Sequence, residues 1–216
     1  METLEIIGIT LRMALASTAL GSLLGGVLGL LLEKAEFPGK KIVVRLCRTL
    51  MGTPPVVAGL VVYILFRRRG LLGAFDLLYT IRAMVIAQTL IITPIVCGMV
   101  YTCAARNAPQ IRAFAKTMGA DSRQTALLIV KEMSGEFYFF VITAFGRAIS
   151  EVGAVMIVGG NLRHKTRTMT TAISMLNSMG EFDQAVILGA LLLVIAFILQ
   201  TLSDFFRRGD FAPENF

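Results

Sequence analysis

The stretch that decides the fold lies at residues 6–32 and reads IIGITLRMALASTALGSLLGGVLGLLL, with Arg12 as its only charged residue. A helix needs about 20 mostly apolar residues to cross a bilayer, so this run is long enough to span one. Four further apolar runs follow along the chain, at residues 47–66, 84–105, 137–160 and 185–206. The sequence therefore predicts an all-α integral membrane protein with about five transmembrane helices.

The composition agrees with this class. Of the 216 residues, 56% are hydrophobic and 16% are charged, whereas a soluble domain carries about a quarter charged residues. The net charge of +7 would suit a nucleic-acid-binding protein, but the hydrophobicity argues against nucleic acid as a partner. The first apolar run is too long for a signal peptide and lacks a clear cleavage site, so we expect it to be retained.

The distribution of Lys and Arg predicts how the chain crosses the membrane. Five spans place the two termini on opposite sides. The first and third connections, with Arg48 and the tail, carry twelve Lys or Arg, while the second and fourth carry seven. Because the richer side is usually cytoplasmic, we expect the N-terminus outside and residues 207–216 as a short cytoplasmic tail.

Several kinds of site chemistry lack their usual signatures. The three cysteines have no paired spacing and His164 is the single histidine, so we predict no disulfide framework and no metal site. Gly39-Lys40-Lys41 lacks the upstream glycine and the hydroxyl residue of a phosphate-binding loop. We therefore expect no ATP hydrolysis and no cofactor in this chain.

Glycine and proline mark two features of the spans. Gly21, Gly25 and Gly29 are four residues apart, a spacing that lets helix backbones approach closely, although membrane helices also tolerate glycine in general. Pro54 and Pro55 interrupt the second run. Because the backbone groups that they free need partners, we expect this span to face other helices rather than lipid.

The third connection has the pattern of two short helices. Pro109 suits the first turn of a helix, and an apolar stripe follows at Ile111, Phe114, Ala115 and Met118. Gly119 should end that helix. Asp121 with Gln124 three residues later resembles a capping box for a second helix. The first helix is expected either to rest on lipid headgroups or to dock into a groove of a partner protein.

Four segments resemble the permease subunits of binding-protein-dependent ABC importers. Residues 113–120, AFAKTMGA, resemble the permease signature, with Ala113 in place of its usual Glu, and Lys131-Glu132 replace its Leu-Pro. Residues 51–60, MGTPPVVAGL, residues 70–73, GLLG, and residues 147–154, RAISEVGA, are similar to segments of oxyanion permeases. The order and spacing agree over nearly the whole chain, and the similarity is greatest to tungstate permeases, with molybdate and sulfate permeases next.

The resemblance implies a type I ABC importer permease domain over residues 6–206 in the cell membrane. It implies a non-catalytic subunit that pairs with a second copy of itself and with two copies of an ATPase subunit that binds the ATP. An extracytoplasmic tungstate-binding protein would deliver the oxyanion. The coupling helix that contacts the ATPase would comprise Ala113, Phe114, Ala115, Met118, Gly119, Ala120, Asp121 and Ser122.

Arg147 and Glu151 are the charges to explain inside a span. They are four residues apart, which predicts one helix face, and each would cost about 2.5–3.5 kcal/mol at a helix centre. They either neutralise each other to stabilise the bundle or lie near a translocation path. The polar or helix-breaking residues that we assign to such a path or to the polar core are Thr53, Pro54, Pro55, Gln88, Thr93, Arg147, Glu151 and Asn161.

The outer connections are unusually basic, at residues 67–69, Arg82, Arg163, Lys165 and Arg167. These side chains either attract the binding protein and its anionic cargo or are ordinary solvated residues. Three other functions stay open: a channel or secondary transporter that needs no ATPase, an intramembrane enzyme that uses Glu151, and an ABC importer of molybdate or sulfate.

Overall fold

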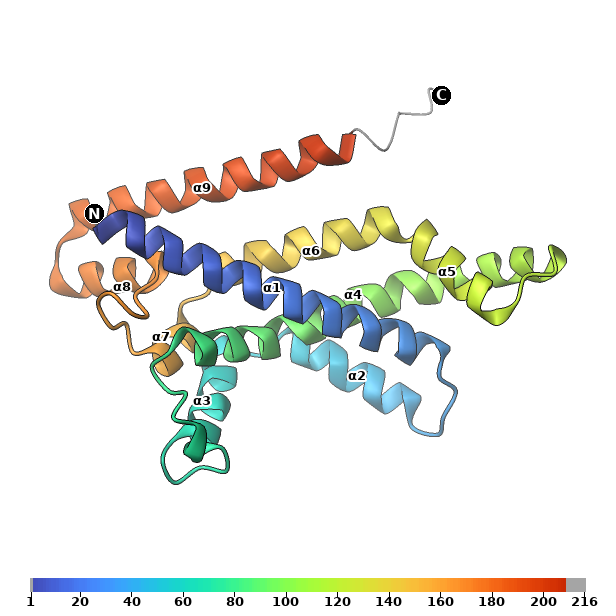
Figure 1. The fold of residues 1–216 in the computed structure, drawn as a ribbon, viewed down its shortest axis with the longest axis horizontal. Helices are drawn as coiled ribbons and strands as arrows, with labels where there is room; N and C mark the ends of the chain where they lie inside the picture. The colour runs from blue at the N-terminus through green and yellow to red at the C-terminus, as the bar shows by residue number, and fades with distance from the viewer. Residues whose placement is uncertain (1, 209–216) are drawn as a thin grey trace. The chain divides into compact units, whose positions relative to one another are not determined.

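The computed structural model describes residues 2–208, and the side chains of residues 3–201. Every regular element in that range is helical, which confirms the all-α class. The order along the chain is α1 (Glu2–Lys34), α2 (Lys40–Met51), α3 (Pro55–Phe66), the 3₁₀ turn η1 (Gly73–Phe75), α4 (Ile81–Thr117), α5 (Ser122–Glu132), α6 (Ser134–Ile149), α7 (Gly153–Gly159), α8 (Met169–Met179) and α9 (Phe182–Arg208) (Figure 1).

The apolar runs fall on three long helices and two bent pairs. Thr3–Lys34, Ile81–Thr117 and Phe182–Thr201 are each long and apolar enough to cross a membrane. The pairs α2 with α3 and α6 with α7 each pass the same test when taken as one bent span. The described residues thus hold three continuous spans, or up to five if each bent pair is one span.

The chain forms two compact units. The first contains residues 2–17, 54–88 and 145–208 of the described chain, and the second contains residues 18–53 and 89–144. In the first unit, α8 packs along α9 (Figure 1). Ile6 of α1, Met169 of α8 and Leu188 of α9 are buried together there. Van der Waals contact of this kind stabilises the packing of membrane helices.

The second unit is built on a close crossing of α1 and α4. A side-chain carbon added to Gly25 would lie 2.7 Å from the Thr93 carbonyl oxygen, and one added to Gly29 would lie 2.8 Å from that of Cys97. Only glycine leaves room for such an approach. The small-residue spacing of the first run therefore serves helix packing, as predicted.

Within the fourth connection, α8 begins at Met169, and the hydroxyl-bearing Thr168, Thr170 and Thr171 are buried. One sequence-based expectation is wrong. No new helix starts at Pro109, since α4 continues through it to Thr117. The carbonyl that Pro109 leaves without its usual donor belongs to Ala105, and both residues are exposed, where solvent can serve that carbonyl.

The first two residues of the predicted tail, residues 207–216, are helical. Arg207 and Arg208 are the last residues of α9 rather than the start of an irregular segment. The rest of the predicted tail, residues 209–216, lies outside the described residues.

Candidate functional site

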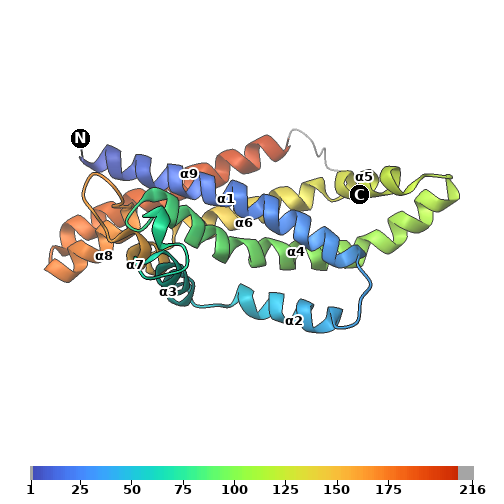
Figure 2. The same ribbon diagram turned by 60° about the horizontal axis from the view of Figure 1, so that its bottom comes forward.

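The second halves of the two bent pairs pack against each other. α3 and α7 lie side by side in both views (Figures 1 and 2). Gly59 on α3 allows this, because a side-chain carbon there would lie 2.7 Å from the Cα atom of Ala154. The predicted break at the proline pair is confirmed: Pro54 is the N-cap of α3 and Pro55 its first residue, where a missing N–H is tolerated.

The break between α6 and α7 holds a buried carboxylate. Glu151 lies just after α6 ends at Ile149, and it is only 3% exposed. One carboxylate oxygen pairs with a guanidinium nitrogen of Arg147 at 2.9 Å, and the other accepts the backbone N–H of Ala154 at 3.1 Å. The predicted pair therefore forms, but the two residues do not share one helix face, because Glu151 stands outside α6 and caps α7.

Gln88 serves the backbone carbonyl next to this break. Its side chain is 1% exposed. The amide nitrogen donates to the carbonyl of Ala148 at 2.8 Å, and the amide oxygen accepts the hydroxyl of Ser17 at 2.6 Å. The interruption after α6 takes away the usual helical donor of the Ala148 carbonyl, and Gln88 supplies another donor, as a broken membrane helix requires.

A cluster of threonines completes the polar network. The Thr170 hydroxyl donates to the carbonyl of Glu151 at 2.8 Å. Thr171 donates to the side-chain oxygen of Asn161 at 3.0 Å, and Thr168 forms a capping box with Thr171 at the start of α8. Ser17 and these threonines are not among the site residues predicted from the sequence. The Thr168-x-x-Thr171 spacing before an apolar run is the signal that would have indicated a helix start.

The other predicted path residues have separate surroundings. Asn161 has a left-handed backbone with φ of 50° and follows α7. Thr93 belongs to the second unit, and its hydroxyl donates to the carbonyl of Thr89 on its own helix at 2.7 Å. Thr53, also in the second unit, lies in the irregular stretch before Pro54. The structure thus links Gln88, Arg147, Glu151 and Asn161 through shared partners in the first unit.

One charged group of this network, the guanidinium of Arg147, remains partly exposed. Glu151 is almost fully enclosed, whereas the Arg147 side chain retains 35% exposure. A buried carboxylate is tolerated when a cation and hydrogen-bond donors both reach it. The site therefore holds one carboxylate tightly and presents the remaining donors of one guanidinium, a chemistry suited to weak contacts with an anion and not to acid–base catalysis.

The turn between α4 and α5 in the second unit has the predicted caps. Gly119 has φ of 72°, and the N–H of Ala120 bonds to the carbonyl of Ala115 at 3.0 Å, which closes the end of α4 in the manner usual for a glycine C-cap. The Asp121 and Gln124 capping box is present with both bonds formed. The backbone of this turn is therefore fixed from both sides.

The apolar stripe at this turn is split. Ala115 is 1% exposed, whereas Phe114 is 61% and Met118 is 71% exposed. Ala113, Gly119, Asp121 and Ser122 are also exposed, and Ala120 is half-buried. One side of the stripe thus anchors the helix end in the second unit while the other side presents two large apolar side chains.

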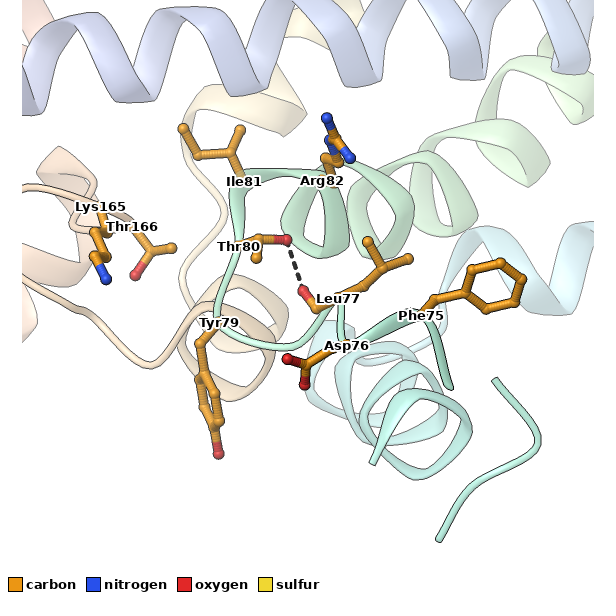
Figure 3. A pocket seen from close by; sticks show the side chains of 9 residues that line it. All are labelled: Phe75, Asp76, Leu77, Tyr79, Thr80, Ile81, Arg82, Lys165 and Thr166. Carbon is orange, nitrogen blue, oxygen red and sulfur yellow. Dashed lines mark hydrogen bonds between the residues drawn. The ribbon is translucent and has the colours of Figure 1, made fainter. Parts of the chain in front are cut away.

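A hollow of about 430 Å³ lies between the second and fourth connections of the first unit, and the residues that line it are Phe75, Asp76, Leu77, Tyr79, Thr80, Ile81, Arg82, Lys165 and Thr166 (Figure 3). The pKa of the Tyr79 phenol is raised, chiefly because the neighbouring Tyr63 disfavours a second negative charge. In Figure 3, Arg82 and Tyr79 point in opposite directions and Lys165 lies apart from both. These side chains do not converge on one point, so the hollow is not a built anion site.

Comparisons with known proteins identify the family. Residues 21–209 match the family described as "Binding-protein-dependent transport system inner membrane component". The tungstate uptake system permease protein TupB of Peptoclostridium acidaminophilum is 41% identical over 93% of this chain and 88% of its own length. A probable anion ABC transporter permease of Haloferax volcanii is 38% identical, over 94% and 90%. TupB of Campylobacter jejuni is 34% identical, over 80% and 72%.

A solved structure agrees at the level of the fold. The inward-facing MetNI methionine ABC transporter has a chain that superposes with a TM-score of 0.69 at 16% identity, covering 98% of this chain and 97% of that one. The helices, the bent spans and the family match together lead to one assignment. The chain belongs to the family of inner membrane components of binding-protein-dependent ABC transport systems.

Proposed function

We propose that this chain is the permease subunit of an ATP-driven importer that carries tungstate into the cell. The observation that carries the proposal is the 41% identity to a tungstate uptake permease over most of both chains. The cargo is a tetrahedral oxyanion, so the path needs donors and positive potential without a deep binding site. The guanidinium of Arg147, partly exposed beside an already neutralised Glu151, supplies that combination.

The energy for transport comes from a separate ATPase, of which two copies bind two copies of this permease. The coupling residues proposed to contact the ATPase lie at the α4–α5 turn, from Ala113 to Ser122. Two facts support this role: Phe114 and Met118 are exposed apolar residues, and the backbone beneath them is capped on both sides. An exposed aromatic side chain on a rigid turn is the usual form of an interface anchor. The permease itself binds no ATP and catalyses no reaction.

An extracytoplasmic binding protein delivers the oxyanion and determines most of the selectivity. The basic residues of the second and fourth connections are exposed, apart from the half-buried Arg167, and would speed the encounter with an acidic, anion-loaded partner. The orientation that follows has the N-terminus outside and the C-terminus in the cytoplasm. The path residues are those of the polar network, namely Gln88, Arg147, Glu151 and Asn161, together with Thr53, Pro54, Pro55 and Thr93.

Uptake of tungstate into vesicles that contain the permease, its ATPase and its binding protein tests the proposal. We expect uptake to require ATP and to stop when the ATPase is omitted. Excess molybdate or sulfate should compete less well than unlabelled tungstate. Equal competition by sulfate would reassign the cargo, and uptake without the ATPase would indicate a channel or secondary transporter instead.

A further inference from the structure

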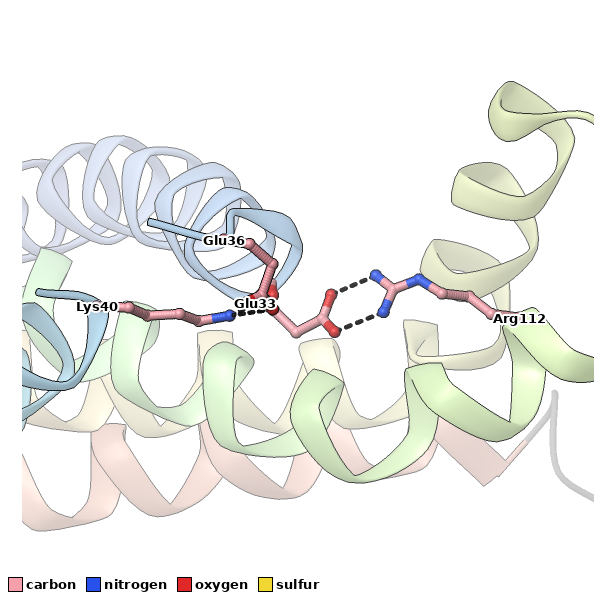
Figure 4. A network of polar contacts seen from close by, with 4 residues as sticks. All are labelled: Glu33, Glu36, Lys40 and Arg112. Atoms are coloured by element: carbon pink, nitrogen blue, oxygen red, sulfur yellow. Dashed lines mark hydrogen bonds and ion pairs between the residues drawn. The ribbon is translucent and has the colours of Figure 1, made fainter. Parts of the chain in front are cut away.

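A second group of charged residues ties the coupling turn to the rest of the second unit. Arg112 stands one residue before the coupling residues on α4, and both of its terminal nitrogens bond to Glu33 at the end of α1, at 2.7 and 2.5 Å (Figure 4). The pairing is bidentate, a geometry that fixes orientation as well as distance. It joins α1 and α4 through two residues that are 79 positions apart in the sequence.

The start of α2 reaches the same point. The Lys40 ammonium donates to the backbone carbonyl of Glu33 at 2.9 Å and pairs with Glu36 at 3.4 Å. Figure 4 shows Lys40 and Arg112 approaching Glu33 from opposite sides. The end of α1, the start of α2 and the last turns of α4 therefore meet at one residue.

The burial of this joint sets it apart from an ordinary surface ion pair. The Glu33 side chain is 10% exposed and that of Arg112 is 39% exposed. Exposed pairs contribute little because water screens them, whereas a buried carboxylate that loses its partner is left uncompensated. Arg106 and Glu136, also on α4 and α6 of this unit, form such an exposed pair at 3.3 Å, with exposures of 73% and 44%.

We propose that the Glu33–Arg112 pair is the joint through which movement of the coupling turn reaches α1 and α2, so that Arg112 is a positioning residue for energy coupling. This inference rests on the proposed function, since it needs an ATPase acting at the turn. The long α4 alone carries movement along its own axis. The bidentate pair adds α1, and Lys40 ties the start of α2 to the same residue through the Glu33 carbonyl. Along the chain, α2 leads to the Thr53-Pro54-Pro55 break.

The test compares Arg112→Gln with Arg106→Gln in vesicles that hold the complete transporter, by measuring tungstate uptake and ATP hydrolysis together. We expect Arg112→Gln to lower uptake per ATP hydrolysed by about tenfold, because the largely enclosed Glu33 carboxylate loses its bidentate partner. Arg106→Gln should stay within about twofold of the natural protein. ATP hydrolysis by the Arg112 variant should continue and should still respond to the loaded binding protein, because that response has to pass through a folded permease.

Two more variants keep the inference falsifiable if Arg112→Gln does not accumulate in the membrane. Arg112→Lys keeps the charge but cannot bond to both oxygens in the same fixed fork, so coupling should be intermediate. The exchanged pair Glu33→Arg with Arg112→Glu should recover coupling. Normal uptake per ATP in Arg112→Gln, or in Arg112→Lys where only that variant accumulates, would overturn the inference while leaving the proposed function intact. Loss of ATP dependence in the natural protein would instead overturn the proposed function.

Discussion

The α6–α7 break and the α4–α5 turn both interrupt a helix, but they differ in whether the side chains around them are buried or exposed. At the break, Glu151 and Gln88 are buried and each finds its partners within the first unit. At the turn, the backbone is equally well capped, yet Phe114 and Met118 are left exposed. The polar groups of the break are thus satisfied within this chain, whereas the turn combines a fixed backbone with two exposed apolar side chains.

The largest loss of stability is expected when the buried carboxylate at the α6–α7 break is removed. Glu151→Ala would leave Arg147 without its partner and α7 without its cap. We expect the permease to lose roughly 3 kcal/mol of stability, the lower end for a broken buried pair because Arg147 keeps some exposure. Thermal unfolding in detergent measures this.

Glu151→Gln is the matched control for that change. Its amide oxygen can still accept the N–H of Ala154, so it should lose less stability than Glu151→Ala. Equal stability of Glu151→Ala and the natural protein would show that the pair contributes nothing to the first unit.

The next largest effect should come from the turn, and in binding rather than in folding. Phe114→Asp places a charge where an apolar anchor is proposed, and loss of such an anchor costs about 2 kcal/mol, or about thirtyfold in affinity for the ATPase. The thermal stability of the isolated permease should stay unchanged because Phe114 is already exposed. Co-purification with the ATPase measures the difference.

Leu23→Ala serves as the control for Phe114→Asp. Leu23 is 63% exposed on α1, away from the coupling residues in sequence, and the substitution should leave ATPase binding unaltered. A loss of stability without a loss of affinity in Phe114→Asp would place Phe114 in the core and not at an interface.

A smaller loss of stability is expected from substitutions of Gln88, which lies next to the α6–α7 break. Gln88→Leu removes two hydrogen bonds. The Ser17 hydroxyl keeps the Met13 carbonyl as an acceptor, but the Ala148 carbonyl loses its side-chain donor, at a cost of about 1–3 kcal/mol. Gln88→Glu keeps an acceptor for Ser17 but brings a second buried carboxylate near Glu151. We expect Gln88→Glu to be the less stable of the two in thermal unfolding, and the reverse order would contradict the described geometry.

The smallest effect concerns the cap of α5. Asp121→Ala removes one half of the capping box, which should cost about 1 kcal/mol. Asp121→Asn keeps an acceptor for the Gln124 N–H and should recover most of that loss. Hydrogen exchange of the first turn of α5 measures both variants, and unchanged exchange in Asp121→Ala would mean that the cap does not hold this turn.

Sequence patterns predicted the caps well because they depend on neighbouring residues. Gly119, Asp121 with Gln124, and Pro54-Pro55 each act within a few positions. The same reasoning gave a wrong prediction at Pro109. The helix continues there because Ala105, whose carbonyl loses its usual donor, is exposed. Local rules do not indicate which side of a helix will be solvated.

The α6–α7 break and the joint at Glu33 depend on distant partners. Nothing near Ser150 signals an interruption, because the groups that satisfy it come from Gln88 and Thr170, 60 and 19 positions from their partners. Likewise, Glu33 and Arg112 meet only after α1 and α4 have packed. Their pairing therefore became visible only in three dimensions.

The absence of a helix start at Pro109 has a mechanical consequence. Residues 89–117 of α4 form one uninterrupted shaft in the second unit, about 43 Å long at 1.5 Å per residue. Because no break divides the helix over these residues, its two ends tilt together. A tilt of about 5° about one end would carry the opposite end through about 4 Å, so a modest torque at the turn becomes a displacement wider than a water molecule.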